Sequence, residues 1–260
     1  MNAVAIFPHV GGAVSTSVVR AIRILDLVAG SDQPMPLAAI AEALDIPRST
    51  AHVILRDLVA ESVLTCGKPP AYSVGVKAFE IGSAYLRGTG IAAVVGPELA
   101  RLTNVLRFTA HYAILDGTEA LYLCKEDPPG LGIRLASSVG ARLPSHLTAV
   151  GKASLAWLPD AAVTEHVSLK TKDASGQAVT MKRLSADLAR VRELGYATDD
   201  GQITAGIRCV AAPAFDATGP RGAIGVSFLS SATESLAPIA AEVMESAARV
   251  STLLGGESPA

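Results

Sequence analysis

The side chains best suited to chemistry in this sequence are polar and basic ones between residues 48 and 68. They occur at Arg48, Ser49, Thr50, His52, Arg56 and Lys68. An arginine can pair with guanine or with a phosphate, and serine and threonine hydroxyls can contact phosphates or base edges. This set therefore suits recognition of double-stranded DNA, provided that the fold holds its members on a common exposed surface.

A pair of short helices would hold them there. Ala51, Leu55 and Leu58 form one apolar stripe, and the polar side chains of residues 48–56 lie off it. An upstream helix is predicted by apolar residues at helical spacing, namely Leu37, Ile40, Ala41 and Leu44. Asp45-Ile46-Pro47 interrupts this period, and Pro47 suits the first turn of a new helix because its missing N–H would have no partner there. The pattern predicts a helix-turn-helix whose second helix enters the DNA major groove.

The flanking segments extend this prediction to a winged helix-turn-helix. An amphipathic helix is expected between Ser17 and Gly30. Residues 64–74 contain two short strand-like pieces around a glycine- and proline-rich turn, which is typical of a β-wing, and Lys68 would lie at its tip.

Charge does not by itself favour DNA binding. Residues 1–75 contain five basic and six acidic residues, so this part of the chain has a net charge of −1. A tight non-specific DNA binder would be strongly basic. We therefore expect few phosphate contacts per subunit and an oligomer on DNA. A protein-binding winged module without a DNA role is the alternative interpretation.

The composition of the whole chain limits the other classes. Of 260 residues, 50% are hydrophobic and 18% charged, with a net charge of −2, so a sizeable core is expected and a polybasic protein is excluded. We find no secretory signal and no apolar run of membrane-spanning length. Three distant cysteines indicate reduced thiols in a cytoplasmic protein. The five histidines lack metal-ligand spacing, so neither a metal nor a cofactor is expected.

An enzyme that acts on a small molecule and carries an N-terminal regulatory domain is a further alternative, but few sequence motifs support it. Gly151-Lys152-Ala153 lacks the Ser or Thr that a phosphate-binding P-loop requires. Ser227 lacks the second glycine of a nucleophile elbow. We therefore assign no catalytic residue.

The chain is predicted to have an α+β organisation in three parts. These are a winged helix-turn-helix domain over residues 15–75, a linker helix over 76–89 and an effector-binding domain over 90–256. In the last part, strand pairs alternate with helices, which indicates an antiparallel sheet packed by helices. Strands are expected at 108–115, 119–125, 132–139, 208–215 and 222–229. Helices are expected at 91–106, 147–158, 184–194 and 235–254.

The sequence resembles the IclR family of bacterial transcription regulators from about Ser17 to Leu254. The resemblance rests on several motifs in a fixed order: Arg20-Ala21-Ile22-Arg23-Ile24-Leu25, Pro47-Arg48-Ser49-Thr50-Ala51, Tyr72-Ser73-Val74-Gly75, residues 143–153 (LPSHLTAVGKA), Gly195-Tyr196-Ala197-Thr198-Asp199-Asp200-Gly201 and residues 206–213 (GIRCVAAP). It implies a winged helix-turn-helix, a linker helix and a GAF-like effector domain with an antiparallel sheet. It also implies homodimers or dimers of dimers on palindromic operator DNA, and a small organic effector, often a carboxylate or an aromatic acid.

The resemblance also implies an effector site. Carried over by motif, its positions are Leu135, Ala149, Val150, Asp199, Ile207, Cys209, Gly225 and Ser227. Asp199 and Ser227 would orient the ligand, and the start of the helix near Ala149 would suit an anion. For Leu135, Ile207 and Cys209, ordinary core packing is an equally good interpretation, and Asp200 is an alternative to Asp199 as the inward-facing residue.

Two departures from the family pattern affect this site. Gly225 stands where some relatives have a hydroxyl residue, which predicts a wider site with one donor fewer. Gln202 stands where an acidic residue is common. We expect an aromatic or larger acid-like ligand in preference to a two- or three-carbon acid.

Overall fold

The computed structural model of the chain describes residues 16–130, 137–232 and 235–257. It divides into two compact units, Met1–Gly88 and Thr89–Ala260, which we describe separately. Among the described residues, no helix combines the length and the apolar character needed to cross a membrane.

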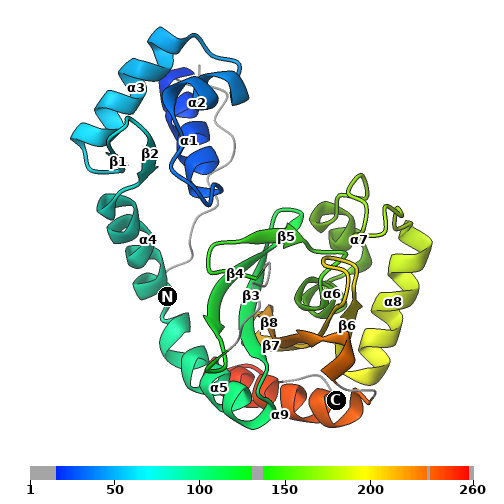
Figure 1. Cartoon of the computed structure of the whole chain (residues 1–260). Coiled ribbons are helices and arrows are strands. Elements are labelled where there is room, and N and C mark those ends of the chain that lie inside the picture. The colour runs from blue at the N-terminus through cyan, green and yellow to red at the C-terminus, as the bar shows by residue number, and fades with distance from the viewer. Residues whose placement is uncertain (1–15, 131–136, 233–234, 258–260) are drawn as a thin grey trace. The chain divides into compact units, whose positions relative to one another are not determined.

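The first unit is a helical bundle with a small hairpin (Figure 1). Its elements are α1 (Thr16–Ala29), α2 (Leu37–Ala43), α3 (Arg48–Ala60), β1 (Leu64–Cys66), β2 (Tyr72–Val74) and α4 (Val76–Thr89). Strands β1 and β2 are antiparallel, with Leu64 opposite Val74. Ile24, Ile40 and Leu55 are fully buried in one core shared by the first three helices. The predicted helix-turn-helix and wing are therefore confirmed.

The turn between α2 and α3 differs in one detail from the prediction. Pro47 lies just before α3 with extended backbone, rather than inside its first turn. The chain reverses at Asp45, whose φ is 50°, and the Ile46 amide donates to the Ala41 carbonyl at 3.0 Å. Ala41 is 4% exposed, which fits the need for a small side chain where α2 packs against its neighbours.

The second unit contains a six-stranded antiparallel sheet in the order β5-β4-β3-β8-β7-β6. Its strands are β3 (Thr109–Asp116), β4 (Glu119–Glu126), β5 (Arg142–Pro144), β6 (Ala197–Asp200), β7 (Ile207–Asp216) and β8 (Gly219–Leu229). The two predicted hairpins, β3–β4 and β7–β8, are confirmed. The strand expected at 132–139 is not confirmed. Residues 137–139 are not in a strand, and residues 131–136 lie outside the described part of the chain. The third strand along the chain is instead β5.

Helices cover the two faces of this sheet (Figure 1). α5 (Ile91–Leu106) and α9 (Ala237–Leu253) pack against each other and against one face. α6 (Ala149–Leu155) packs on the other face, beside α8 (Met181–Leu194), and α7 (Asp160–Val163) lies between them in sequence. The predicted helix at 147–158 is thus shorter. Its start is set by Thr148, whose side chain accepts a hydrogen bond from the Gly151 amide.

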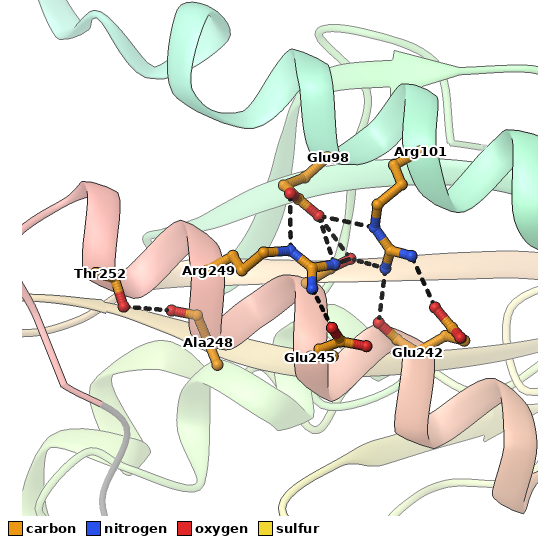
Figure 2. Close-up of polar contacts among 8 residues, drawn as sticks. Glu98, Arg101, Glu242, Glu245, Ala248, Arg249 and Thr252 are labelled. Atoms are coloured by element: carbon orange, nitrogen blue, oxygen red, sulfur yellow. Dashed lines mark hydrogen bonds and ion pairs between the residues drawn. The ribbon is translucent and has the colours of Figure 1, made fainter.

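An ionic cluster joins α5 to α9 (Figure 2). Glu98 of α5 accepts hydrogen bonds from Arg249 and Ser246 of α9, at 2.9 and 3.0 Å, and Arg101 donates to Glu242 at 2.8 Å. Burial would raise the pKa of Glu98, but the hydrogen bonds from Arg249, Ser246 and Arg101 outweigh it and lower that pKa. The cluster ties together the two helices that support the sheet from one side.

Candidate functional site

The predicted DNA-binding side chains lie on the outer side of α3. Arg48, Ser49 and His52 are exposed and Thr50 is half-buried, whereas Ala51 and Leu55 are fully buried against the rest of the unit. One helix therefore holds its polar side chains toward solvent because its apolar stripe is anchored in the core.

Two further basic side chains of this unit are exposed. Arg56 is exposed and forms an ion pair of 2.8 Å with the neighbouring Asp57. An ion pair between two such exposed groups is weak, so a DNA phosphate could replace Asp57 as the partner. Lys68 is exposed in the turn between β1 and β2, in the same unit as α3.

The second unit contains a small cavity between α6 and the sheet. Its lining is His111, Tyr122, Ser137, Leu143, Thr148, Ala149, Val150, Asp199, Ile203, Thr204, Ile207, Cys209 and Ser227. The cavity has about 30 Å³ of free space, which accommodates about two water molecules. An organic effector would therefore bind only after the surrounding side chains or backbone have moved apart.

Six of the eight predicted effector positions line this cavity: Ala149, Val150, Asp199, Ile207, Cys209 and Ser227. Leu135 lies outside the described residues. Gly225 is not among the lining residues. A Cβ atom at this position would lie 2.8 Å from both the Ala211 Cβ and the Val210 carbonyl oxygen. The glycine thus permits close packing on the neighbouring strand, and the expected widening of the site at this position does not occur.

Asp199, rather than Asp200, faces the interior. Asp199 is 3% exposed and its Oδ1 accepts a hydrogen bond of 2.7 Å from the Gln202 amide. Burial raises the pKa of this carboxyl to about 6, although the hydrogen bond from Gln202 and the positive charge of Lys152 oppose the rise. Asp200 is exposed and its carboxylate lies 3.4 Å from the Arg208 guanidinium.

Cys209 and Ser227 face each other across β7 and β8. Their Sγ and Oγ atoms are 3.1 Å apart. Burial raises the pKa of the Cys209 thiol to about 12, and the nearby Asp199 adds to the rise. The thiol therefore stays protonated at neutral pH, which suits a soft wall of a binding site and not a nucleophile.

His111 and Tyr122 also line the cavity, although neither was predicted from the sequence. His111 of β3 is 1% exposed, and its Nδ1 is a buried atom without a hydrogen-bond partner among the described residues. Burial lowers the pKa of His111 to about 3, so the ring is neutral. Its centroid lies 5.2 Å from that of Tyr122. A signal was present, since a histidine inside a strand as apolar as residues 109–115 has an unusual need for a polar partner.

The described lining therefore combines apolar walls with a few polar groups and contains no lysine or arginine. Elsewhere too, the described residues contain no group of three or more histidine, cysteine, aspartate or glutamate side chains that could hold a metal ion.

Comparisons with known proteins cover both units. The chain matches the IclR helix-turn-helix domain over residues 17–65 and the bacterial transcriptional regulator IclR C-terminal domain over residues 83–252. The transcriptional repressor IclR of Escherichia coli (strain K12) is 32% identical over 205 residues, which are 77% of this chain and 74% of that protein.

Solved structures give the same result for the fold. The IclR transcriptional regulator from Alicyclobacillus acidocaldarius is 26% identical, with a TM-score of 0.79 over 92% of this chain and 98% of that chain. An IclR homolog from Microbacterium hydrocarbonoxydans, solved in complex with 4-hydroxybenzoate, is 22% identical. Its TM-score is 0.78 over 92% of this chain and 99% of that chain.

Proposed function

Because this chain belongs to the IclR family of bacterial transcriptional regulators, we propose that it binds operator DNA through α3 and the wing, and that a small aromatic or other carboxylic acid controls this binding. The chain is a transcriptional regulator with a helix-turn-helix DNA-binding domain and an effector-binding C-terminal domain, and its curated relatives are regulators and not enzymes.

The exposed start of α3 carries the DNA-binding part of the proposal. Arg48, Ser49, Thr50, His52 and Arg56 would contact bases and phosphates in the major groove, and Lys68 of the wing would contact the backbone. The single observation that supports this most is the contrast on α3, where Arg48, Ser49 and His52 are exposed while Leu55 is fully buried. A contact of Arg48 with a base edge would contribute about 1–3 kcal/mol to discrimination between sequences.

Fluorescence anisotropy tests this part with DNA from upstream of the protein's own gene, against scrambled DNA at the same salt concentration. We expect Arg48→Ala to weaken binding to the native site about 5- to 100-fold. Arg23→Ala is the matched control, because it removes one exposed positive charge from α1 in the same unit, away from the proposed dimer helix α4. Equal behaviour of the two variants on native and scrambled DNA would contradict base recognition by Arg48 and favour a protein-binding module.

The cavity beside α6 carries the effector part. Its apolar walls suit an aromatic ring, while Asp199, Ser227 and His111 offer polar contacts that would orient hydroxyl and carboxyl groups. The fold can hold such a molecule, since the Microbacterium hydrocarbonoxydans homolog was solved with 4-hydroxybenzoate. Because the described lining has no basic side chain, the carboxyl group would meet hydrogen-bond donors, including the amides at the start of α6.

Isothermal titration with 4-hydroxybenzoate and a panel of acids tests this. We expect aromatic acids to bind more tightly than glyoxylate or acetate, and Ser227→Ala to weaken the best ligand about 5-fold, the effect of one hydrogen bond. Ser231→Ala, at an exposed position after β8, is the control. Preference for a two- or three-carbon acid would refute the proposed ligand class and leave the site itself in place.

The exposed apolar side chains of α4 support a homodimer. Val76, Phe79, Ile81 and Tyr85 are between 50% and 74% exposed on this one helix, a concentration of apolar surface that is typical of an interaction site. We infer that a second copy of the chain packs against this helix, and that dimers pair further on DNA. Sedimentation velocity of Phe79→Glu should show monomers where the unsubstituted protein forms dimers or tetramers. An unchanged distribution would exclude α4 as the interface.

A further inference from the structure

A second cavity, of about 280 Å³, lies between α8 and β6 and is distinct from the proposed effector cavity. Its lining includes five charged residues and one glutamine, namely Lys152, Arg183, Asp187, Arg190, Asp200 and Gln202. Lys152 belongs to α6, Arg183 and Arg190 to α8, and Gln202 follows β6. Two separate helices thus bring three cations to one concave surface, and the segment after β6 adds the neutral Gln202.

Lys152 is a buried cation whose direct hydrogen-bond partner is uncharged. It is 4% exposed, and its Nζ donates a 2.6 Å hydrogen bond to the Gln202 Oε1, which is uncharged. Within the described part of the chain, no carboxylate forms an ion pair with this Nζ, and the negative charges of Asp199 and Asp187 act on it only from a longer distance. An ammonium group has three donors, and a buried charge is stable only when it is paired and hydrogen-bonded. The Gln202 side chain accepts a hydrogen bond from one of the three N–H donors of Lys152, but it does not neutralise the positive charge.

The charged side chains of the lining are basic on balance. Asp187 and Asp200 are its acidic members, against Lys152, Arg183 and Arg190, so the net charge of these groups is +1. Asp200 is moreover paired with Arg208. Arg183 and Arg190 are exposed and seven residues apart on α8, which places them on the same side of the helix. Guanidinium groups of this kind bind phosphate oxygens in a two-pronged manner.

We propose that this groove binds an anion of the phosphate class, either inorganic phosphate or a small phosphomonoester, with Lys152 at its base and Arg183 and Arg190 at its entrance. The anion would provide a negative charge in direct contact with Lys152, which the neutral Gln202 does not provide. The volume of the groove also suits a small metabolite carrying a phosphate group. Burial lowers the pKa of Lys152, and a bound anion would oppose this effect by favouring the charged form.

Thermal unfolding followed by the fluorescence of Trp157, the single tryptophan of the chain, tests this proposal. Inorganic phosphate and glycerol 3-phosphate would be titrated separately against chloride at constant ionic strength. We expect a saturable rise of about 3–5 °C in Tm when the bound anion is present at about ten times its Kd. A response to both probes would assign the site to phosphomonoesters as well as to free phosphate, and a response to phosphate alone would restrict it to the free ion.

Gln202→Glu is the decisive variant, because it is nearly isosteric and places a carboxylate beside the Lys152 Nζ. We expect its Tm in chloride to exceed that of the unsubstituted protein, and its response to phosphate to disappear. Arg183→Ala and Arg190→Ala should each weaken the response about 10-fold. Lys182→Ala, which removes an exposed charge of α8 outside the groove, should leave it unchanged. An equal response in the unsubstituted protein, Gln202→Glu and Lys182→Ala, or no saturable response, would overturn the proposal.

Discussion

Replacing Asp199 with asparagine should stabilise the effector-binding unit at neutral pH, and this gain should vanish in acid. Burial raises the pKa of Asp199 from its ordinary value of 3.8 to about 6. The folded protein therefore binds the proton more tightly than the unfolded chain does. Below pH 3.8 the buried carboxyl group has no electrostatic cost, and the cost grows as pH rises to about 6. The difference of about 2 in pKa corresponds to about 3 kcal/mol at pH 7.

His111 titrates with the opposite sign in the same cavity. Burial lowers its pKa from 6.5 to about 3, so the unfolded chain takes up a proton first as the pH falls. Stability is then lost between about pH 6.5 and pH 3. Between pH 6 and pH 4 the titration of His111 lowers the free energy of unfolding by about 2.5 kcal/mol, while protonation of Asp199 raises it by about 2 kcal/mol. The two effects nearly cancel in the unsubstituted protein, and only the loss from His111 remains in Asp199→Asn.

Urea unfolding at pH 4, 5, 6 and 7 measures this difference. Trp157 reports on the correct unit, because it packs against the core beneath α6 and forms an edge-to-face contact with Phe215. We expect Asp199→Asn to be more stable by about 3 kcal/mol at pH 7 and by less than about 1 kcal/mol at pH 4. Other acidic groups titrate alike in both proteins, so their effects largely cancel in the comparison.

Asp200→Asn is the control for this experiment, since it removes the adjacent but exposed carboxylate and should change stability at pH 7 by much less than Asp199→Asn does. The reasoning is refuted if Asp199→Asn destabilises the protein at pH 7, or if its difference from the unsubstituted protein does not depend on pH. Either result would mean that Asp199 is ionised at little cost and that its surroundings are more polar than their burial indicates.

Three further changes have expected outcomes. Gly151→Ala should destabilise the second unit by about 3 kcal/mol or more in urea unfolding, because its Cβ would lie 2.1 Å from the Ser145 carbonyl oxygen; near-neutral stability would contradict this close approach. Leu55→Ala should cost about 2–5 kcal/mol in the first unit and weaken DNA binding, as measured by circular dichroism and anisotropy. Glu98→Gln should cost about 1–3 kcal/mol at pH 7, because it removes the negative charge beside Arg249. Since the pKa of Glu98 is lowered in the folded protein, this difference should shrink as the pH falls through that pKa, and a constant difference would argue against the ion pair.

Local features of this protein could be predicted from the sequence. Apolar spacing alone located α2 and α3, and α5 was predicted with the bounds that the structure has, Ile91–Leu106. The β3–β4 hairpin followed from Asp116-Gly117, where Gly117 adopts a φ of 59°. Helical periodicity and turn formation depend on residues that are close in sequence, so a short stretch of sequence is enough to predict these elements. The family motifs likewise indicated six of the residues that line the cavity.

Only the tertiary structure decided which side chains meet. Asp199 rather than Asp200 faces inward because β6 pairs with β7 in a particular register, which a one-residue slip would reverse. His111 reaches the cavity because β3 lies beside β8, although more than 100 residues separate their sequences. Gly225 serves strand packing because Ala211 is opposite it. Lys152 is left with a neutral partner because the loop after β6 folds back over α6. Each of these results depends on contacts between distant segments, and local sequence patterns contain no record of them.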